Sequence, residues 1–167
     1  MKKLGILLLL AMFSLYSFGQ KTAFINTDTI FSKLPQMQEA QKKLGDFLKQ
    51  VQTELNDMQK EYQQKVSDYQ NSKDTLDKFI ADKKLEEIKD LDKKIQNFKV
   101  QAQTQYLQMQ KELLNPIEEN FKKAVEKVAK KKGYTSVIQI TPQIIYYDKK
   151  YDITDLVLKE MGVNSKK

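Results

Sequence analysis

The sequence contains no cysteine and no histidine, and it has only five glycines and three prolines in 167 residues. Without thiols the chain cannot form disulfides, so its stability must come from packing or from oligomerisation. Most nucleophile–base pairs and most transition-metal sites need one of the two missing residue types. The few glycines form no phosphate-binding loop. We therefore expect no catalytic residues, no cofactor and no metal site, and we predict that the protein is not an enzyme.

The first 19 residues have the layout of a secretory signal peptide. Lys2 and Lys3 precede an apolar run from Leu4 to Phe13, and small residues follow at Ser17 and Gly19. The run is short for a membrane span, which needs about 20 residues, so cleavage is favoured over a retained anchor. No cysteine follows the run, which excludes attachment as a lipoprotein. We predict that residues 1–19 are removed on export.

The remaining chain is mildly basic. Removing Lys2 and Lys3 leaves 27 of the 29 basic residues against 22 acidic ones, a net charge of +5. The positive charge is only mildly clustered and carries no interleaved aromatics, so a nucleic acid partner is not expected. The carboxylates lie beside lysines on solvated helix faces, where pairing between neighbouring turns is their expected role. A general attraction to acidic partners or to an anionic membrane surface fits the balance better.

The middle of the chain has the spacing of a coiled coil. Apolar residues at alternating steps of three and four give a narrow seam instead of a wide helix stripe. The first seam contains Leu44, Leu48, Val51, Leu55, Met58, Tyr62, Val66 and Tyr69, and the second contains Leu85, Ile88, Leu91, Ile95, Phe98, Ala102, Tyr106, Met109 and Leu113. The polar stretch 70–75 separates them, with Asp74 or Thr75 as the expected helix cap. We predict an antiparallel hairpin arm over residues 36–116.

The two ends of the chain carry the strand-like segments. Thr22–Asn26 is rich in β-branched and aromatic residues, and Ser136–Ile140 and Ile144–Tyr147 are expected to form a hairpin through the intervening TPQ. Asp28 is the expected cap of a short helix, and a final helix should run from about Ile153 to Met161. The helical hairpin returns the chain to its start, so the first strand can pair with the later ones.

The predicted fold class is therefore mostly α with a small β part. A long antiparallel coiled-coil hairpin should project from a small β-rich body that both chain ends form, residues 20–35 plus 117–167. Pro116 should kink the second helix of the hairpin or restart it. A body of this size is marginal alone, and association of several copies would cover its strand edges. We therefore expect a homo-oligomer.

The arms carry no candidate catalytic residues, but their surface could bind a partner. Helically spaced aromatics usually belong to the seam, but some could remain open and contact an unfolded chain. The residues considered for this role are Tyr62, Tyr69, Phe79, Phe98 and Tyr106. Weak contacts from several arms would hold an unfolded chain through avidity, without ATP.

Three segments resemble the Skp, or OmpH-like, family of periplasmic chaperones. They are the start AFINTDTIFSKLPQMQEAQKKL, the junction LLNPIEENFKKAVEKVAKKKGYTSVI and the end YDITDLVLKEMG. The resemblance implies a periplasmic homotrimer with three helical hairpins around a cavity. It also implies an ATP-independent holdase that binds unfolded outer-membrane proteins during outer-membrane biogenesis. By the same resemblance, the body and trimer interface would contain Phe24, Ile25, Val137, Ile138, Ile140, Ile144 and Ile145.

The sequence departs from the family in the charge of the arm. Lys60 to Lys99 contains ten lysines and nine acidic residues, whereas the best-known relatives have strongly basic arm tips. Contact with an anionic membrane surface should therefore be weak at the tips. Two alternatives remain: a structural coiled-coil scaffold of the envelope with one defined folded partner, and a peripheral binder of the membrane surface.

Overall fold

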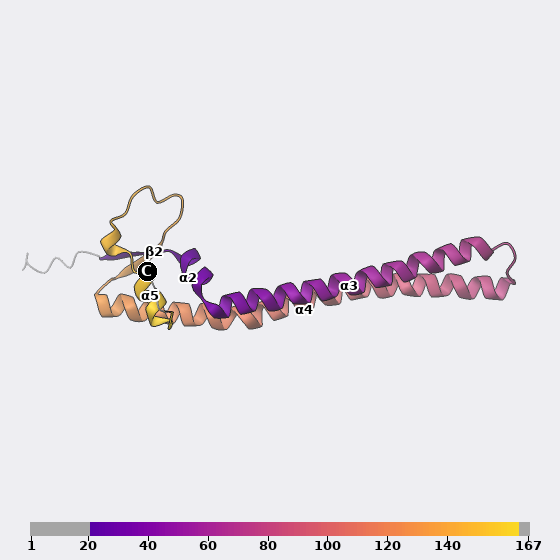
Figure 1. The fold of residues 1–167 in the computed structure, drawn as a ribbon, viewed down its shortest axis with the longest axis horizontal. Helices are drawn as coiled ribbons and strands as arrows, with labels where there is room; N and C mark the ends of the chain where they lie inside the picture. Colours follow the sequence, from indigo (N-terminus) through magenta and orange to yellow (C-terminus); the bar gives the residue numbers. More distant parts are fainter. Residues whose placement is uncertain (1–20, 164–167) are drawn as a thin grey trace, which may run out of the picture. The chain divides into compact units, whose positions relative to one another are not determined.

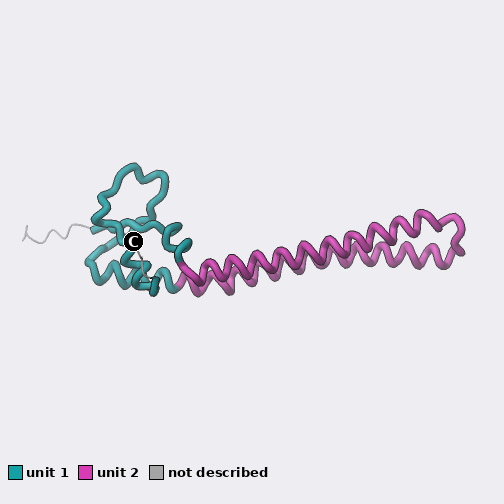
Figure 2. The backbone as a smooth tube through the Cα atoms, in the orientation of Figure 1, with its two compact units in different colours: residues 1–33, 120–167 teal, residues 34–119 magenta. Residues whose placement is uncertain are grey.

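The computed structural model describes residues 21–163, which are mostly helical with one small sheet (Figure 1). The predicted leader lies outside the described residues. The elements are β1 (Thr22–Ile25), α2 (Thr27–Lys33), α3 (Pro35–Ser72), α4 (Lys78–Lys132), β2 (Ser136–Gln139), η1 (Lys149–Tyr151) and α5 (Thr154–Glu160). The chain divides into two compact units, which Figure 2 shows in different colours. Unit 1 contains residues 1–33 and 120–167, and unit 2 contains residues 34–119.

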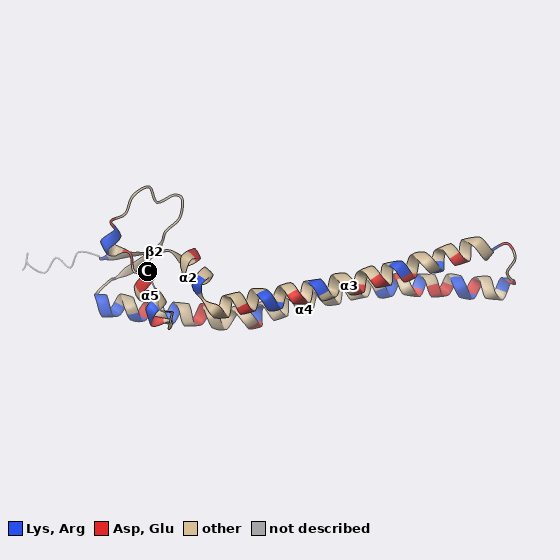
Figure 3. Ribbon diagram, viewed as in Figure 1, with Lys and Arg blue, Asp and Glu red and all other residues tan. Residues whose placement is uncertain are grey.

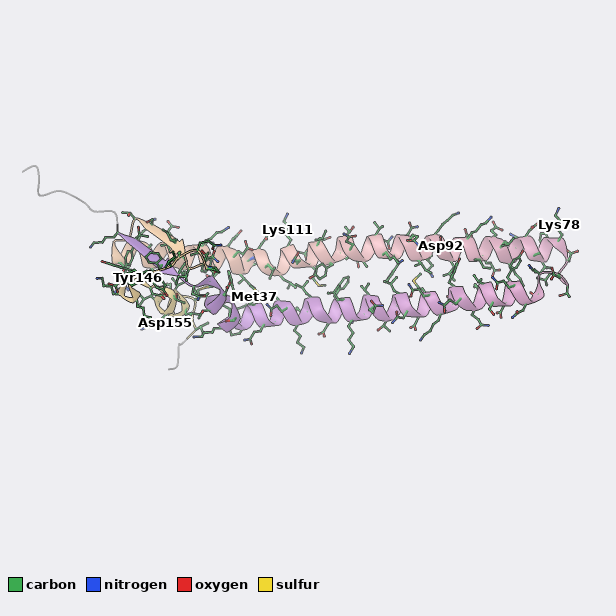
Figure 4. The ribbon with its side chains drawn as sticks, turned by 90° about the horizontal axis from the view of Figure 1, so that it is seen from above. Met37, Lys78, Asp92, Lys111, Tyr146 and Asp155 are labelled. Carbon is green, nitrogen blue, oxygen red and sulfur yellow. The ribbon has the colours of Figure 1, made fainter. Side chains whose placement is uncertain are left out.

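Unit 2 is the predicted helical hairpin. The helix α3 begins at Pro35, whose fixed φ suits a first helical turn, and most of its residues are good helix formers. The chain then reverses, and α4 runs back along α3 with side chains filling the space between the two helices (Figure 4). Met58 of α3 packs with Leu91 and Ile95 of α4 in a buried cluster, which Leu55, Tyr62 and Phe98 extend. Fully burying one such aliphatic side chain is worth about 1.5–3 kcal/mol, so this cluster contributes to the stability of the hairpin.

The turn of the hairpin lies slightly later than the predicted stretch 70–75. The helix α3 continues to Ser72, and residues 73–77 form the connection. Here the prediction of the cap was wrong, because the side chain of Asp77 accepts a hydrogen bond from the backbone N–H of Phe79 at 2.8 Å. Asp77 directly precedes the first residue of α4, which is where a side-chain oxygen reaches the free N–H groups of the first turn. Thr75 instead donates its hydroxyl to the backbone oxygen of Ser72.

Pro116 does not restart the second helix. The helix α4 is assigned continuously over 55 residues, with Pro116 inside it. A proline removes one backbone hydrogen bond and presses on the preceding turn. Pro116 is exposed, so water can bond the carbonyl that lacks its usual donor.

Unit 1 is built around the pairing of β1 with β2. The two strands run parallel, with Thr22 opposite Ser136 and Ile25 opposite Gln139. On its other side β1 is bridged by Asp152, and the N–H of Ile153 donates to the carbonyl of Phe24 at 2.9 Å. The first strand therefore pairs with a C-terminal strand, as predicted, and both of its edges are occupied.

The predicted hairpin of Ser136–Ile140 with Ile144–Tyr147 is wrong for the described chain. Residues 140–148 form a loop, and Ile145 is 99% exposed. The predicted partner of the segment 144–147 was β2, and the outer edge of β2 stays unpaired within the described chain. The β part of unit 1 is accordingly two strands of four residues, and the expected β-rich body is mainly helical.

Short helices and two glycines complete unit 1. The carboxamide oxygen of Asn26, and not Asp28, caps α2 by accepting from the N–H of Thr29 at 2.8 Å. Gly133 ends α4 at φ 72°, and the N–H of Tyr134 donates to the carbonyl of Ala129 in a Schellman motif. Gly162 ends α5 in the same way. The buried core of unit 1 contains Ala23, Ile25, Ile30, Ala124, Val128, Ile153, Val157 and Leu158.

Candidate functional site

The acidic residues of the described chain form no metal centre. Within residues 21–163 no group of carboxylates is arranged to hold a metal ion, and no helix is long and apolar enough to cross a membrane. The carboxylates of unit 2 instead pair with lysines one turn away, such as Glu86 with Lys83 at 2.9 Å and Asp90 with Lys93 at 3.6 Å. Figure 3 shows the two signs of charge alternating along both helices of the hairpin. These charged side chains therefore keep the outer faces of the helices hydrated.

Unit 2 exposes large apolar side chains among these charges. Val100 is 65% exposed and Leu107 is 56% exposed, although each lies near the middle of a helix that has a buried seam. Further exposed apolar side chains of unit 2 are Leu48, Phe79 and Ile80. Single exposed apolar residues are common on proteins, but their repetition on one hairpin is a property of a contact surface.

Val100 and Leu107 form a stripe on the outside of the seam. They are seven residues apart, so they lie on the same side of α4, about 10 Å from each other along its axis. The seam residues of the same stretch are Phe98, Ala102 and Tyr106, which are buried or half-buried. The stripe is thus a second apolar line on α4 that α3 does not cover.

An apolar groove lies between α3 and α4 in the same stretch. It has a volume of about 250 Å³, and its walls are almost entirely apolar carbon. Its lining includes Val51 and Ala102, and the short side chain of Ala102 leaves room for the groove. The lining also contains Leu48, which is 49% exposed, and the charged residue Lys99. Such a groove can take an apolar side chain of a flexible chain.

A second groove of unit 2 is larger and has a charged rim. Its volume is about 490 Å³, with Met58 and Phe98 in its lining. Glu54 and Asp90 contribute negative charge to the lining, and Lys93 and Lys94 contribute positive charge. The two grooves offer apolar contacts next to charges of both signs. Such a surface can contact partner chains of many different sequences and is not selective for one of them.

One ion pair joins the two helices of the hairpin. The ammonium of Lys65 donates a hydrogen bond to the carboxylate of Glu87 at 2.8 Å. This bond lowers the pKa of Glu87 and raises the pKa of Lys65 from their ordinary values. An exposed pair contributes little energy, and this one links the turn of Lys65 in α3 to the turn of Glu87 in α4.

The structure brings four of the five predicted contact aromatics into or beside the seam. Tyr62 and Phe98 pack on the buried cluster around Met58, and Tyr69 and Tyr106 are also half-buried. Phe79, near the start of α4, is 66% exposed. Of the five, Phe79 thus offers the largest fraction of its surface to a partner.

Unit 1 presents a second apolar surface along its sheet. The outer edge of β2 is not covered by another strand of the described chain. Beside β2 lies a groove of about 380 Å³, lined by Phe121, Val125 and Ala129 of α4 and by Val137. In the loop 140–148, Ile145 and Tyr146 are 99% and 83% exposed.

The seven residues predicted for the body differ in burial. Ile25 is buried, and Phe24 is half-buried against the ring of Tyr147 at 5.1 Å. Burial raises the pKa of the Tyr147 hydroxyl, and the carboxylate of Asp152 beside it raises that pKa further. Half-buried positions are Val137, Ile140 and Ile144, and exposed positions are Ile138 and Ile145.

Sequence reasoning missed the exposed stripe on α4. Val100 and Leu107 fall between the seam positions, so a search for one heptad pattern passes over them. Their seven-residue spacing was the available signal, and Leu114, half-buried, continues it. Leu48 was assigned to the seam because nothing in the sequence shows that the two helices leave a groove beside it.

Comparison with known proteins gives a family match and structural matches. The family model described as outer membrane protein (OmpH-like) matches residues 21–161. No curated protein sequence matches the chain. A crystal structure of a candidate outer membrane chaperone (OmpH-like) from Caulobacter crescentus CB15 superposes with a TM-score of 0.73. It is 11% identical, and the alignment covers 85% of this chain and 83% of that one, so the two proteins share a fold.

Proposed function

The chain belongs to the OmpH-like outer membrane protein family, and from this premise we propose that it is an ATP-independent periplasmic chaperone. In this proposal it holds unfolded outer-membrane proteins and prevents their aggregation. The observation that carries the proposal is the set of exposed apolar side chains on unit 2, above all Val100 and Leu107, among dense charges of both signs. A scaffold that binds one folded partner would instead be expected to present one continuous apolar face to that partner.

The surface of unit 2 suits a client without fixed structure. Strands of outer-membrane barrels alternate apolar and polar residues, so their unfolded chains expose apolar side chains singly. The stripe on α4 and the groove beside Leu48 bind such side chains one at a time. Each contact is weak, and several hairpins that bind the same client together raise the overall affinity through avidity.

We propose further that the protein is a homotrimer. Unit 1 supports association, because the outer edge of β2 is open and Ile145 and Tyr146 are exposed in the loop that follows it. An open strand edge and two exposed apolar side chains are unfavourable in water, and a neighbouring copy covers both. The hairpins of three copies would then surround a shared cavity for the client.

The experiment that tests the function is aggregation of a urea-denatured outer-membrane β-barrel protein on dilution, followed by light scattering. Stoichiometric amounts of the mature chain should suppress the scattering without ATP. The double variant Val100→Lys and Leu107→Lys should suppress it at least about threefold less, since a lysine at each position removes an apolar contact.

The matched control carries Gln105→Lys and Gln108→Lys, two exposed positions in the same stretch of α4. It adds the same charge without removing apolar surface, so it should act as the wild type does. Unchanged scattering in the presence of wild-type protein refutes the holdase. Equal loss of activity in both variants refutes the assignment of the stripe.

A further inference from the structure

Methionine is the residue type of this protein that a mild oxidant modifies most readily. The sequence contains no cysteine and no tryptophan, so the thioether sulfur of methionine has no more reactive competitor. Within residues 21–163 the methionines are Met37, Met58, Met109 and Met161. Three of them are half-buried, whereas Met58 is only 6% exposed. The effect of oxidation on the fold therefore depends most on Met58.

Met58 is the centre of the contact between α3 and α4 in the half of the hairpin nearer the turn. In the described helix α3 the buried residues are Ala40, Leu44 and Met58, so beyond Leu44 no other side chain of α3 is fully buried. From α4, Leu91 and Ile95 join Met58 in one buried cluster. The packing of the two helices in this half thus depends on one thioether side chain.

The same residue borders a groove that a small oxidant can enter. The second groove of unit 2, of about 490 Å³, is lined by Met58 and Phe98 together with Asn97 and Gln101. One water molecule takes up about 30 Å³ in the liquid, so the groove has room for hydrogen peroxide. The carboxamides of Asn97 and Gln101 can donate hydrogen bonds to such a polar molecule. Met58 is therefore buried in the seam and still within reach of peroxide.

We propose that Met58 is an oxidation site, and that its oxidation by hydrogen peroxide opens the seam of the hairpin. The sulfur of Met58 attacks one peroxide oxygen, and a sulfur–oxygen bond forms as the oxygen–oxygen bond breaks. The sulfur loses two electrons to the peroxide, and after proton transfer the second oxygen leaves as water. The product is methionine sulfoxide, which is polar where the thioether was apolar.

A sulfoxide is unfavourable in the surroundings of Met58. Its neighbours in the buried cluster, Leu91 and Ile95, carry no side-chain hydrogen-bond donor. Burying a polar group without a hydrogen bond is costly, so the sulfoxide oxygen gains water only when the helices separate or the side chain turns out of the seam. Either movement uncovers Leu91 and Ile95. These two side chains then enlarge the exposed apolar surface of unit 2, which in the proposed function holds unfolded clients.

The test treats the mature chain with hydrogen peroxide and follows each methionine by peptide mass spectrometry. Met58 should gain one oxygen atom, and the melting temperature should then fall by about 5 °C or more, since a buried polar group without a partner is costly for a chain of this size. The fluorescence of anilinonaphthalene sulfonate should rise as apolar side chains become exposed. Methionine sulfoxide reductases should reverse both changes.

Two variants assign the effect to one sulfur. Met58→Leu removes the sulfur at nearly constant volume, a change that cores tolerate, so its melting temperature should be the same before and after peroxide. The matched control Met109→Leu lies in the same hairpin and keeps Met58, so it should respond as the wild type does. A triple variant, Met37→Leu with Met109→Leu and Met161→Leu, should also respond fully. It keeps the test decisive even where Met58→Leu does not fold.

Two results would overturn the oxidation site. One is that Met58 takes up no oxygen while the half-buried methionines do. The other is an equal fall in melting temperature for the wild type and Met58→Leu.

The effect on clients rests on the proposed function and is measured separately. The oxidised wild type should suppress client aggregation at about half the concentration that the reduced protein needs, because more apolar surface is exposed. An opened seam without this gain would overturn the link to clients. A reduced wild type that suppresses no aggregation refutes the holdase instead, and the melting temperatures still decide the oxidation site.

Discussion

At the scale of single residues, the hairpin contains two kinds of apolar side chain that differ in exposure and therefore in role. Leu91 is 7% exposed and belongs to the cluster with Met58 and Ile95. Leu107 lies on the same helix but presents more than half of its surface to water. Burial makes the first a determinant of stability, and exposure leaves the second available for contact with a partner.

This contrast gives the first prediction. Leu91→Ala should lower the free energy of unfolding by about 2–4 kcal/mol, because it removes buried methyl groups and leaves a cavity. Leu107→Ala should lower it by less than about 0.5 kcal/mol, as is usual for exposed positions. Urea unfolding followed by circular dichroism measures both. Similar losses in the two variants would mean that Leu107 is covered in solution.

Two glycines give a second matched pair of variants. Gly45 lies inside α3 and Gly133 ends α4 at φ 72°, and a Cβ at either position would meet only open space. Gly45→Ala should stabilise the protein by about 0.5–1 kcal/mol, since alanine is the better helix former. Gly133→Ala should destabilise it by about 1–2 kcal/mol through the left-handed conformation alone. Thermal melts measure both, and a gain at Gly133 would contradict the Schellman end of α4.

At the scale of elements, α3 and α4 could be predicted closely from the sequence and the β part could not. The heptads of Leu44–Tyr69 and Leu85–Leu113 repeat over many turns, so their signal survives local irregularities. The segment Ile144–Tyr147 has strand composition, but a strand needs a neighbour, and pairing is a long-range property. The occupation of both edges of β1 by β2 and Asp152 could not be read from local spacing.

The candidate site was predictable only in outline. The prediction that the hairpin carries the contacts followed from the absence of catalytic residue types and remains a prediction. Which residues are exposed depends on how completely the facing helix covers each position, as the groove lined by Leu48 and Ala102 illustrates. Of the aromatics proposed from sequence, Phe79 is the one that the fold leaves mostly exposed.

The ion pair between the helices predicts how the stability of the hairpin depends on pH. The pKa of Glu87 is held below its ordinary value of 4.5 by the hydrogen bond from Lys65. A lowered pKa in the folded state means that the pair stabilises the hairpin above pH 4.5 and loses this effect as the pH falls through the lowered pKa. The melting temperature of the wild type should therefore drop more between pH 7 and pH 3 than that of Lys65→Gln.

The control for this prediction is Lys89→Gln, an exposed lysine of α4 that pairs with no described residue. Its melting temperature should follow pH as the wild type does. The effect is small because the pair is exposed, so the comparison uses differences between variants measured together. Identical pH dependence of the wild type and Lys65→Gln would show that the pair does not form in solution.

At the scale of the whole molecule, the open edge of β2 and the exposed loop side chains argue that one copy is incomplete. Multi-angle light scattering should give three times the chain mass for the wild type. Ile145→Asp with Tyr146→Asp should lower that mass, since charges at a buried interface are costly, whereas Gln143→Asp in the same loop should not. A wild-type mass of one chain would contradict the trimer.

The central claim is that unfolded clients contact the apolar stripe of α4, and the absence of cysteine allows a direct measurement of it. A single cysteine can be introduced at Leu107, or at exposed Gln105 on another face of the same helix as a control, and labelled with a benzophenone photo-crosslinker. With an unfolded outer-membrane β-barrel protein present, the account predicts strong crosslinking from position 107 and at least about fivefold less from position 105. Equal crosslinking from both positions, or none from position 107, would contradict it.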